Sequence, residues 1–287
     1  ISAGIATLCM AFFANYPVAL ASGMGLNAFF AFTVCGAMGY SYKVALTAVF
    51  IEGIIFMLLS LFKFREALVN KIPSNLKFAI TAGIGLFIAI IALLNANVVV
   101  ASESTTVALG ELSSPTVVLS LVGLLIIGAL QHYKVPGGIL LGILITWVLG
   151  IIAQLVGWYV PNPEAGVYSV IPQFSLSSFE APKMFQFDFG FIAKNVPAFI
   201  LIVFTFLYTD IFDTVGTLIG VAEKGKLLDK DGSLPNATGA LMADAVGTVV
   251  GACFGTSTVT SYVESSAGVA AGGRTGLTAV TTAVLFF

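Results

Sequence analysis

The segment GACFGTSTVTSYVESSAGVAAGG, residues 251–273, decides the fold because it breaks the helical pattern within an apolar region. It is rich in glycine, serine and threonine, and β-branched residues gather at 256–260. Such residues favour extended backbone, whereas glycine weakens a helix interior. The segment therefore predicts a short strand followed by a half-helix that begins near Val263.

A second segment of this kind, ANYPVALASGMGLNAFFAF at 14–32, places Pro17, Gly23 and Gly25 inside another apolar run. It predicts a further short strand, with a half-helix beginning near Gly25. Irregular backbone at membrane depth is tolerated only where it is buried in protein or lines a cavity. Two interrupted segments, one in each half of a chain, indicate a transporter with its substrate site near the bilayer midplane.

Composition supports a membrane protein. Of the 287 residues, 58% are hydrophobic and only 9% are charged, whereas a soluble domain carries about 25% charged residues. The mean hydropathy is +1.04, and several runs approach the roughly 20 apolar residues that cross a bilayer as a helix. We expect a multi-pass helical protein of the cell membrane, since a β-barrel would show short alternating segments.

The apolar runs predict spans at 1–15, 16–38 (broken), 41–62, 74–94, 115–131, 135–159, 190–222, 236–253, 254–271 (broken) and from 274 onward. Alternating these spans across the membrane places most lysine and arginine residues on one side, which the positive-inside rule makes cytoplasmic. Both ends of the sequence read as the interior of a span, without an initiating methionine. We therefore expect a piece of a longer protein.

The sequence does not indicate a metal ion, a cofactor or a nucleic acid as a ligand. The three cysteines, Cys9, Cys35 and Cys253, lie in apolar surroundings without metal-like spacing, so we expect buried thiols and neither a metal site nor a cofactor. No basic stripe with interleaved aromatic residues indicates nucleic acid.

Five acids lie within the predicted spans: Glu52, Asp210, Asp213, Asp244 and Glu264. An acid at the bilayer centre costs about 3 kcal/mol on insertion scales, so these side chains should face a protein or water interior. Asp210 and Asp213 are one helical turn apart, which predicts that both point into the same space. Two close carboxylates resist simultaneous ionisation, so such a pair suits proton coupling.

The other polar residues at membrane depth differ in their expected roles. For Glu52 a structural role, such as a hydrogen bond to a neighbouring helix, is favoured. Asp244 lies among small residues that permit tight helix packing, and a structural role is again favoured. Asn27 directly follows the break at Gly23 and Gly25, and its amide can donate and accept, so a binding role is favoured there.

Three motifs resemble those of AzgA-like purine permeases, which belong to the nucleobase–ascorbate (xanthine/uracil permease) superfamily. They are ANYPVALASGMGLNAFFAFTV at 14–34, YTDIFDTVGTLIGVAEKG at 208–225 and TSTVTSYVESSAGVAAGGRTGLTAV at 256–280. The resemblance spans essentially the whole chain. It implies an all-α polytopic membrane protein with an inverted-repeat 7+7 transporter fold. The chain would cover about spans 2 to 11, with two broken spans that each contain a short strand and a half-helix.

The resemblance also implies a domain organisation. Residues 1–40 would form core-domain spans of the first repeat, and 41–160 the gate-domain spans and the end of that repeat. Residues 161–190 would form an extracellular loop, 191–273 the core-domain spans 8 to 10 of the second repeat, and 274–287 the start of span 11.

By motif, the resemblance implies a substrate site made of Asn27, Asp210, Asp213, Tyr262, Val263 and Glu264. Asp210 corresponds to the acid that binds the base, and the three acids of this set are the proton-coupling candidates. Uracil and xanthine carriers place a histidine in this region, where the sequence has Asp213 or Thr214, and that departure favours purines. Carboxylates suit the N–H groups of a purine because charge-assisted hydrogen bonds are stronger than neutral ones.

The resulting expectation is a proton-coupled symporter, not an enzyme, that imports hypoxanthine, guanine and adenine by alternating access. Its partners would be the purine nucleobase, the proton and the lipid bilayer, with a homodimer left open. A uracil or xanthine carrier is the nearest alternative, and an anion carrier of the same fold is disfavoured because the acids would repel its ligand. An intramembrane aspartyl protease would need its two acids on separate helices, whereas Asp210 and Asp213 share one.

Overall fold

The computed structural model describes residues 1–62, 74–102, 104–162, 167–172, 182–229 and 233–287. The chain divides into two compact units, Ile1–Ile84 with Ala181–Phe287 (unit 1) and Gly85–Glu180 (unit 2). Of the predicted external loop at 161–190, residues 163–166 and 173–181 lie outside the described residues.

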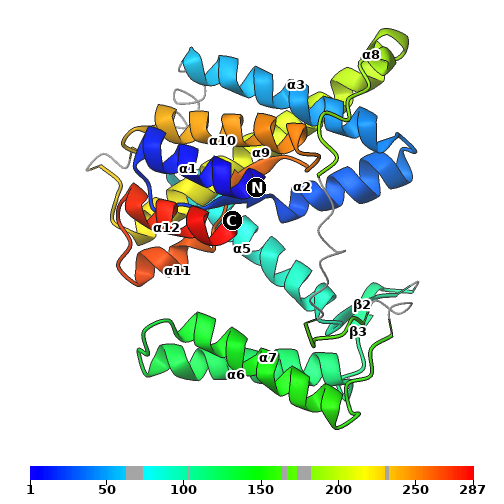
Figure 1. The fold of residues 1–287 in the computed structure, drawn as a ribbon, viewed down its shortest axis with the longest axis vertical. Helices are drawn as coiled ribbons and strands as arrows, with labels where there is room; N and C mark the ends of the chain where they lie inside the picture. The colour runs from blue at the N-terminus through cyan, green and yellow to red at the C-terminus, as the bar shows by residue number, and fades with distance from the viewer. Residues whose placement is uncertain (63–73, 103, 163–166, 173–181, 230–232) are drawn as a thin grey trace. The chain divides into compact units, whose positions relative to one another are not determined.

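Unit 1 holds most of the helices and one small sheet (Figure 1). Its described elements are α1 (Ser2–Ala14), β1 (Leu20–Ser22), α2 (Met24–Ala28), the π-helix η1 (Phe29–Ala37), α3 (Tyr42–Leu61), α8 (Gly190–Lys194), α9 (Val196–Lys224), α10 (Ala237–Cys253), β4 (Val259–Ser261), α11 (Ser265–Ala270) and α12 (Gly276–Phe286). The helix α5 (Ser74–Asn95) runs from unit 1 into unit 2, which also contains β2 (Val99–Ser102), β3 (Thr106–Leu109), α6 (Pro115–His132) and α7 (Gly138–Leu155).

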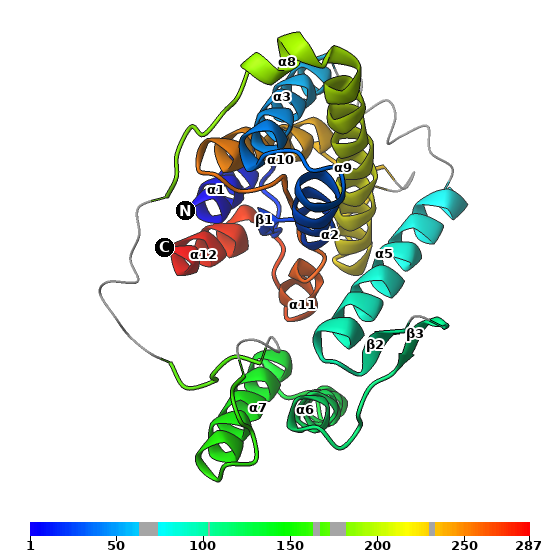
Figure 2. The same cartoon turned by 90° about the vertical axis from the view of Figure 1, so that its right-hand side faces the viewer.

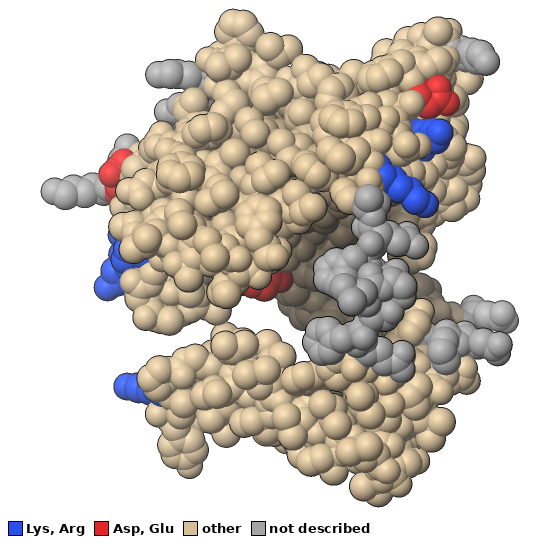
Figure 3. All heavy atoms as spheres, in the orientation of Figure 1, with Lys and Arg blue, Asp and Glu red and all other residues tan. Residues whose placement is uncertain are grey.

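The helices follow the predicted spans closely. Within the described residues, four helices are long and apolar enough to cross a membrane: α3, α6, α7 and α9. Local sequence sets their starts: the side chain of Ser41 caps α3, and Ser114 caps α6 with Pro115 in the first turn, a position where the missing proline N–H costs nothing. Figure 3 shows a face on which most of the described surface is neither acidic nor basic, as expected beside lipid.

The prediction of one continuous span at 190–222 was wrong at its start. The structure divides this region into α8 and α9, because Asn195 has a non-helical backbone conformation (φ −140°, ψ 51°). Pro197 then lies in the first turn of α9. Residues 95–114, which separate two of the predicted spans, contain the antiparallel hairpin formed by β2 and β3.

Both interrupted segments are confirmed as a strand followed by a short helix. The half-helix after β1 begins at Met24, and the one after β4 begins at Ser265. The first continues as the π-helix η1, which the sequence pattern did not predict. π-helical turns are rare and are frequent at functional sites.

The helix α10 lies between α1 and α3, and glycines allow this close approach (Figures 1 and 2). A methyl group added at Gly247 would lie 2.8 Å from the side chain of Ala6 on α1. One added at Gly53 on α3 would lie 2.7 Å from Val249 on α10. The small residues around Asp244 thus permit the tight packing predicted for them.

Candidate functional site

The two interrupted segments meet in an antiparallel pair of strands. Leu20, Ala21 and Ser22 of β1 lie opposite Ser261, Thr260 and Val259 of β4. The pairing extends beyond the strands: Gly23 N donates to the carbonyl of Thr258 over 3.0 Å, and Tyr262 N donates to that of Ala19 over 2.9 Å. Figure 2 shows β1 between α1 and α2. We call this paired region, residues 19–23 with 257–262, the strand crossing.

Buried threonines attach the strand crossing to two helices. The hydroxyl of Thr7 on α1 donates to the carbonyl of Leu20 over 3.1 Å and accepts from its N–H over 2.9 Å. The hydroxyl of Thr248 on α10 donates to the carbonyl of Val259 over 2.9 Å. Both threonines are fully buried. Each strand is therefore bonded to its own supporting helix, which satisfies backbone groups that the broken helices leave without partners.

Two acids gather at the β4 side of the crossing. The hydroxyl of Thr260 donates to Oδ2 of Asp213 over 3.1 Å, and the side chain of Asp213 is half-buried. Glu264 is exposed and occupies the N-cap position of α11. Asp213, Tyr262 and Glu264 lie within electrostatic range of one another. Asp213 and Glu264 therefore form one acidic surface.

Tyr262 and Val263 form the turn between β4 and α11. The carbonyl of Tyr262 accepts from Ser265 N over 3.1 Å, and that of Val263 accepts from Ser266 N over 2.9 Å. The phenol of Tyr262 donates to the carbonyl of Ser22. The ring of Tyr262 is thus held against the first strand, and both turn residues are half-buried.

Asn27 reaches the same region from α2. Its side chain is exposed, and its Oδ1 accepts a hydrogen bond from the hydroxyl of Ser257. Ser257 lies two residues before β4, whose Thr260 contacts Asp213. Three of the predicted site residues, Asn27, Asp213 and Glu264, therefore belong to the surface around the strand crossing.

Asp210 lies elsewhere, in the interior of unit 1. The hydroxyl of Thr214 lies 3.3 Å from Oδ1 of Asp210 and 3.0 Å from Oδ2 of Asp244 on α10. All three side chains are fully buried. Although Asp210 and Asp213 are one turn apart on α9, their hydrogen bonds lead to different places. The prediction that both point into one space was therefore wrong. Asp210 belongs to an interior cluster with Thr214 and Asp244, whereas Asp213 belongs to the surface around the strand crossing.

Glu52 is a further acid that bonds to the strand crossing. It is fully buried on α3, and its Oε2 accepts from the hydroxyl of Thr258 over 3.1 Å. The predicted partner of Glu52 was a neighbouring helix, whereas this bond goes to the residue before β4. Among the residues that the structure describes, no group of three or more histidine, cysteine or acidic side chains is arranged to hold a metal ion.

The hydroxyl groups were the part of the site that sequence reasoning missed. Thr214 contacts both Asp210 and Asp244, and Ser257, Thr258 and Thr260 bond to Asn27, Glu52 and Asp213 respectively. The run TSTVTS at 256–261 was interpreted only as an extended segment. Its signal was nevertheless present, because hydroxyl groups at membrane depth need partners, and the acids and Asn27 are suitable acceptors.

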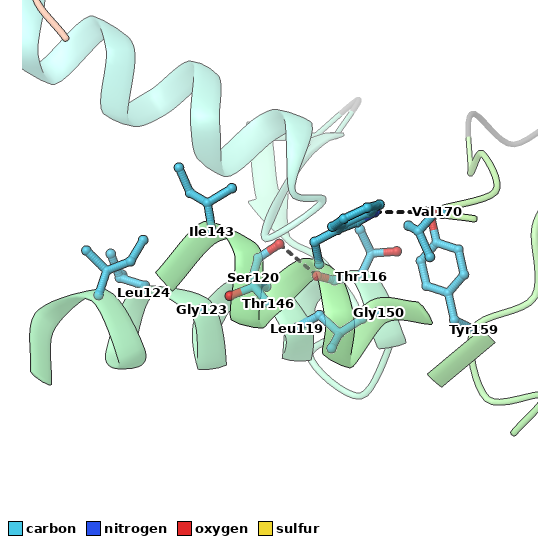
Figure 4. A pocket seen from close by; sticks show the side chains of 12 residues that line it. Thr116, Leu119, Ser120, Gly123, Leu124, Ile143, Thr146, Gly150, Tyr159 and Val170 are labelled. Atoms are coloured by element: carbon cyan, nitrogen blue, oxygen red, sulfur yellow. Dashed lines mark hydrogen bonds between the residues drawn. The ribbon is translucent and has the colours of Figure 1, made fainter. Parts of the chain in front are cut away.

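Unit 2 contains an apolar pocket between α6 and α7 that holds none of these acids (Figure 4). Its volume is about 440 Å³, and its walls include Leu119, Ile143 and Thr146. The indole of Trp147 closes part of the wall by donating to the carbonyl of Val170 over 2.9 Å. Because no charged side chain lines this pocket, it has no group suited to bind a proton.

Residues 1–287 match the Permease family along their whole length. The chain belongs to this family. It is therefore a transporter-family protein with several membrane-spanning helices, and not an enzyme, as the motifs predicted. The permease chain is 46% identical to a putative permease of Methanocaldococcus jannaschii over 286 residues, which are 100% of this chain and 63% of that protein.

Two further relatives carry more specific names. The permease chain is 47% identical to the guanine/hypoxanthine permease PbuO of Bacillus subtilis, covering 98% of this chain and 63% of that protein. It is 43% identical to the adenine permease AdeQ of Escherichia coli, covering 99% of this chain and 61% of that protein. The chain thus spans somewhat less than two thirds of the length of these relatives.

A solved structure supports the fold of the permease chain. The transmembrane domain of a cyanobacterial bicarbonate transporter, BicA, matches it with a TM-score of 0.61 at 18% identity, covering 99% of this chain and 72% of that one. At this identity the likeness concerns the fold alone. The mostly helical fold is therefore shared with the transmembrane domain of this transporter.

The interior cluster generates a prediction about stability. Thr214→Val keeps the shape of the side chain but removes the hydroxyl that contacts Asp210 and Asp244. Loss of a buried hydrogen-bonding group costs about 1–3 kcal/mol, so we expect the thermal unfolding midpoint in detergent to fall by several degrees. Thr214→Ser should restore most of the loss.

The matched control is Thr205→Val on the same helix, where the hydroxyl bonds only to the backbone carbonyl of Leu201 at an exposed position. This control should leave the midpoint nearly unchanged. If Thr214→Val unfolds at the same temperature as Thr205→Val, the hydroxyl does not join the two acids as described.

Proposed function

We propose that the full-length protein is a proton-coupled symporter that imports purine nucleobases by alternating access. The base would bind at the surface around the strand crossing, between Asn27 on one side and Asp213 with Glu264 on the other. The observation that carries this proposal is that residues of the strand crossing bond to two of these side chains: Ser257 to Asn27 of α2 and Thr260 to Asp213 of α9. Glu264, at the start of α11, lies within electrostatic range of Asp213.

The chemistry of this surface suits a neutral heterocycle. Purine bases carry ring N–H groups, which the carboxylates of Asp213 and Glu264 can accept with charge-assisted hydrogen bonds. The amide of Asn27 and the phenyl ring of Tyr262 add a polar contact and an aromatic contact. Asn27 and Asp213 contact Ser257 and Thr260, which are three residues apart in the chain.

The names of the relatives support purines as the substrate class. The guanine/hypoxanthine permease and the adenine permease both align with nearly all of this chain. An anion carrier is the less favoured reading, although the BicA likeness shows that the fold occurs in a bicarbonate transporter. The exposed Glu264 and half-buried Asp213 would repel an anion, since like charges at short range are unfavourable.

The interior cluster supports proton coupling. A threonine hydroxyl has one proton to donate, yet Thr214 contacts carboxylate oxygens of both Asp210 and Asp244. Both hydrogen bonds form fully when one aspartic acid carries a proton and donates it to the threonine oxygen. We assign the coupled proton to Asp210, because Asp213, one turn away on α9, contacts the proposed base site.

Alternating access would move the helices that carry this site against the remaining spans. Thr7 attaches β1 to α1, and Thr248 attaches β4 to α10 in the same manner. The two attachments resemble a repeated arrangement. This correspondence supports the inverted-repeat organisation implied by the motifs. The strand crossing would then travel as one body with α1 and α10.

The first prediction concerns the base site. Asp213→Asn and Glu264→Gln should each reduce uptake of radiolabelled hypoxanthine by more than tenfold, because each removes a charged acceptor for a ring N–H. Membrane insertion, measured by fluorescence of a fused reporter, should stay normal. Glu111→Gln, an exposed acid that accepts from the nearby Ser113 hydroxyl, is the control and should leave uptake unchanged. Near-normal uptake by both variants would contradict a base site at Asp213 and Glu264.

The second prediction concerns the proton. Asp210→Asn keeps a hydrogen-bonding group beside Thr214 but cannot exchange a proton, so it should abolish accumulation driven by a pH gradient. Exchange of hypoxanthine across vesicles without a gradient should persist. The comparison uses proteoliposomes with and without an imposed gradient. Equal gradient-driven accumulation by Asp210→Asn and the parent protein would exclude Asp210 as the proton carrier.

A further inference from the structure

We propose that Thr260 is a positioning residue of the base site, which holds the Asp213 carboxylate in place, and that Gly23 must lack a side chain for Thr260 to do so. This inference rests on the proposed base site and names the contact that fixes one of its acids. Thr260 lies in the middle of β4, opposite Ala21 of β1, and is 1% exposed. It acts on the base through Asp213.

The hydrogen bond between Thr260 and Asp213 has a defined direction. The hydroxyl of Thr260 lies 3.1 Å from Oδ2 of Asp213. An ionised carboxylate can only accept, so the hydroxyl is the donor whenever Asp213 carries its charge. Hydrogen bonds to a charged group are stronger than neutral ones. The bond therefore places the half-buried carboxylate, which comes from α9, against the strand crossing.

Gly23 restricts the side chain that makes this bond. A methyl group added at Gly23 would lie 3.1 Å from Cγ2 and 3.3 Å from Oγ1 of Thr260, closer than the roughly 3.5–4.0 Å of a favourable contact. Both branches of Thr260 thus pack over the bare backbone of Gly23. Because a β-branched side chain has few χ1 conformations, this packing keeps the hydroxyl directed at Asp213.

Space, and not backbone conformation, requires glycine at position 23. Gly23 has φ −62° and ψ 126°, an extended conformation that any residue adopts. Glycine is often needed because its φ is positive, but that reason does not apply here. An alanine could therefore adopt the same backbone, and its methyl group would press directly on Thr260.

Gly23 also connects this contact to the other polar residue of the proposed site. Its N–H donates to the carbonyl of Thr258 over 3.0 Å, and its carbonyl accepts from the backbone N–H of Asn27 over 2.7 Å. A shift of Thr260 away from Gly23 would therefore move Asp213 relative to α2, which carries Asn27. Groups that bind a ligand must be held to within about 0.5 Å of the productive geometry.

The test measures the initial rate of radiolabelled hypoxanthine uptake by the full-length protein over a range of concentrations. Thr260→Val keeps the branched shape and removes the donor, so KM should rise about tenfold while the maximal rate per inserted protein changes little. Thr260→Ser keeps the hydroxyl and should raise KM only about twofold. Gly23→Ala should raise KM about fivefold, because overpacking displaces Thr260.

The matched control adds the same methyl group elsewhere in the same interrupted segment. Gly36 is exposed on η1, and a methyl group there would meet only the carbonyl oxygen of Ala31, at an ordinary distance of 3.4 Å. Gly36→Ala should therefore keep the KM of the parent protein.

The double variant Gly23→Ala/Thr260→Ser separates positioning from a general loss of packing. The serine lacks Cγ2, the atom nearest to the added methyl group, and retains the hydroxyl. Its KM should be lower than that of Gly23→Ala alone, whereas two independent defects would multiply. A KM at or above that of Gly23→Ala would overturn the role of Gly23.

The remaining results distinguish this inference from the proposed function. If the parent protein takes up no purine base, the proposed function fails, and this inference fails with it. If the parent takes up hypoxanthine and Thr260→Val has the parent KM, the function stands and the role of Thr260 is overturned. If Thr260→Val does not reach the membrane, Thr260→Ala, which also lacks the hydroxyl, replaces it, with the same expected rise in KM and the same contradicting result.

Discussion

The antiparallel pairing of β1 with β4 is the interaction on which the rest of this structure depends. Two helices that stop at membrane depth leave N–H and carbonyl groups without partners, and no water is available in the bilayer core to bind them. The pairing of Leu20–Ser22 with Val259–Ser261 satisfies part of this need, and the hydroxyls of Thr7 and Thr248 satisfy another part. These hydrogen bonds thereby stabilise a polar surface within a largely apolar protein.

The same crossing gives two acids on one helix different surroundings. Asp213 meets Thr260 of β4 and remains half-buried, whereas Asp210 is fully buried and shares Thr214 with Asp244. A carboxylate beside a partly open surface suits recognition of a ligand N–H, and one enclosed with a second acid suits storage of a proton. Under the proposed mechanism, α9 connects these two tasks over a single helical turn.

The sequence predicted the framework better than the details of the site. Apolar runs predicted the helices, and the breaks at proline and glycine predicted both strands, because these patterns depend only on residues close together in the sequence. Periodicity alone could not separate Asp210 from Asp213, since the direction of each side chain depends on α10 and β4, which lie far away in sequence. Asn27 and Glu52 bond to the hydroxyls of Ser257 and Thr258, contacts that only the folded chain defines.

Ligand protection of a cysteine placed in the β4–α11 turn tests most directly whether the crossing binds the base. In full-length protein with the native Cys9, Cys35 and Cys253 replaced by serine, the labelling rate of Val263→Cys by a membrane-permeant maleimide would be measured. We predict that hypoxanthine slows labelling several-fold and that uracil does not. Equal rates with and without hypoxanthine, in protein that still accumulates it, would contradict a base site at the strand crossing.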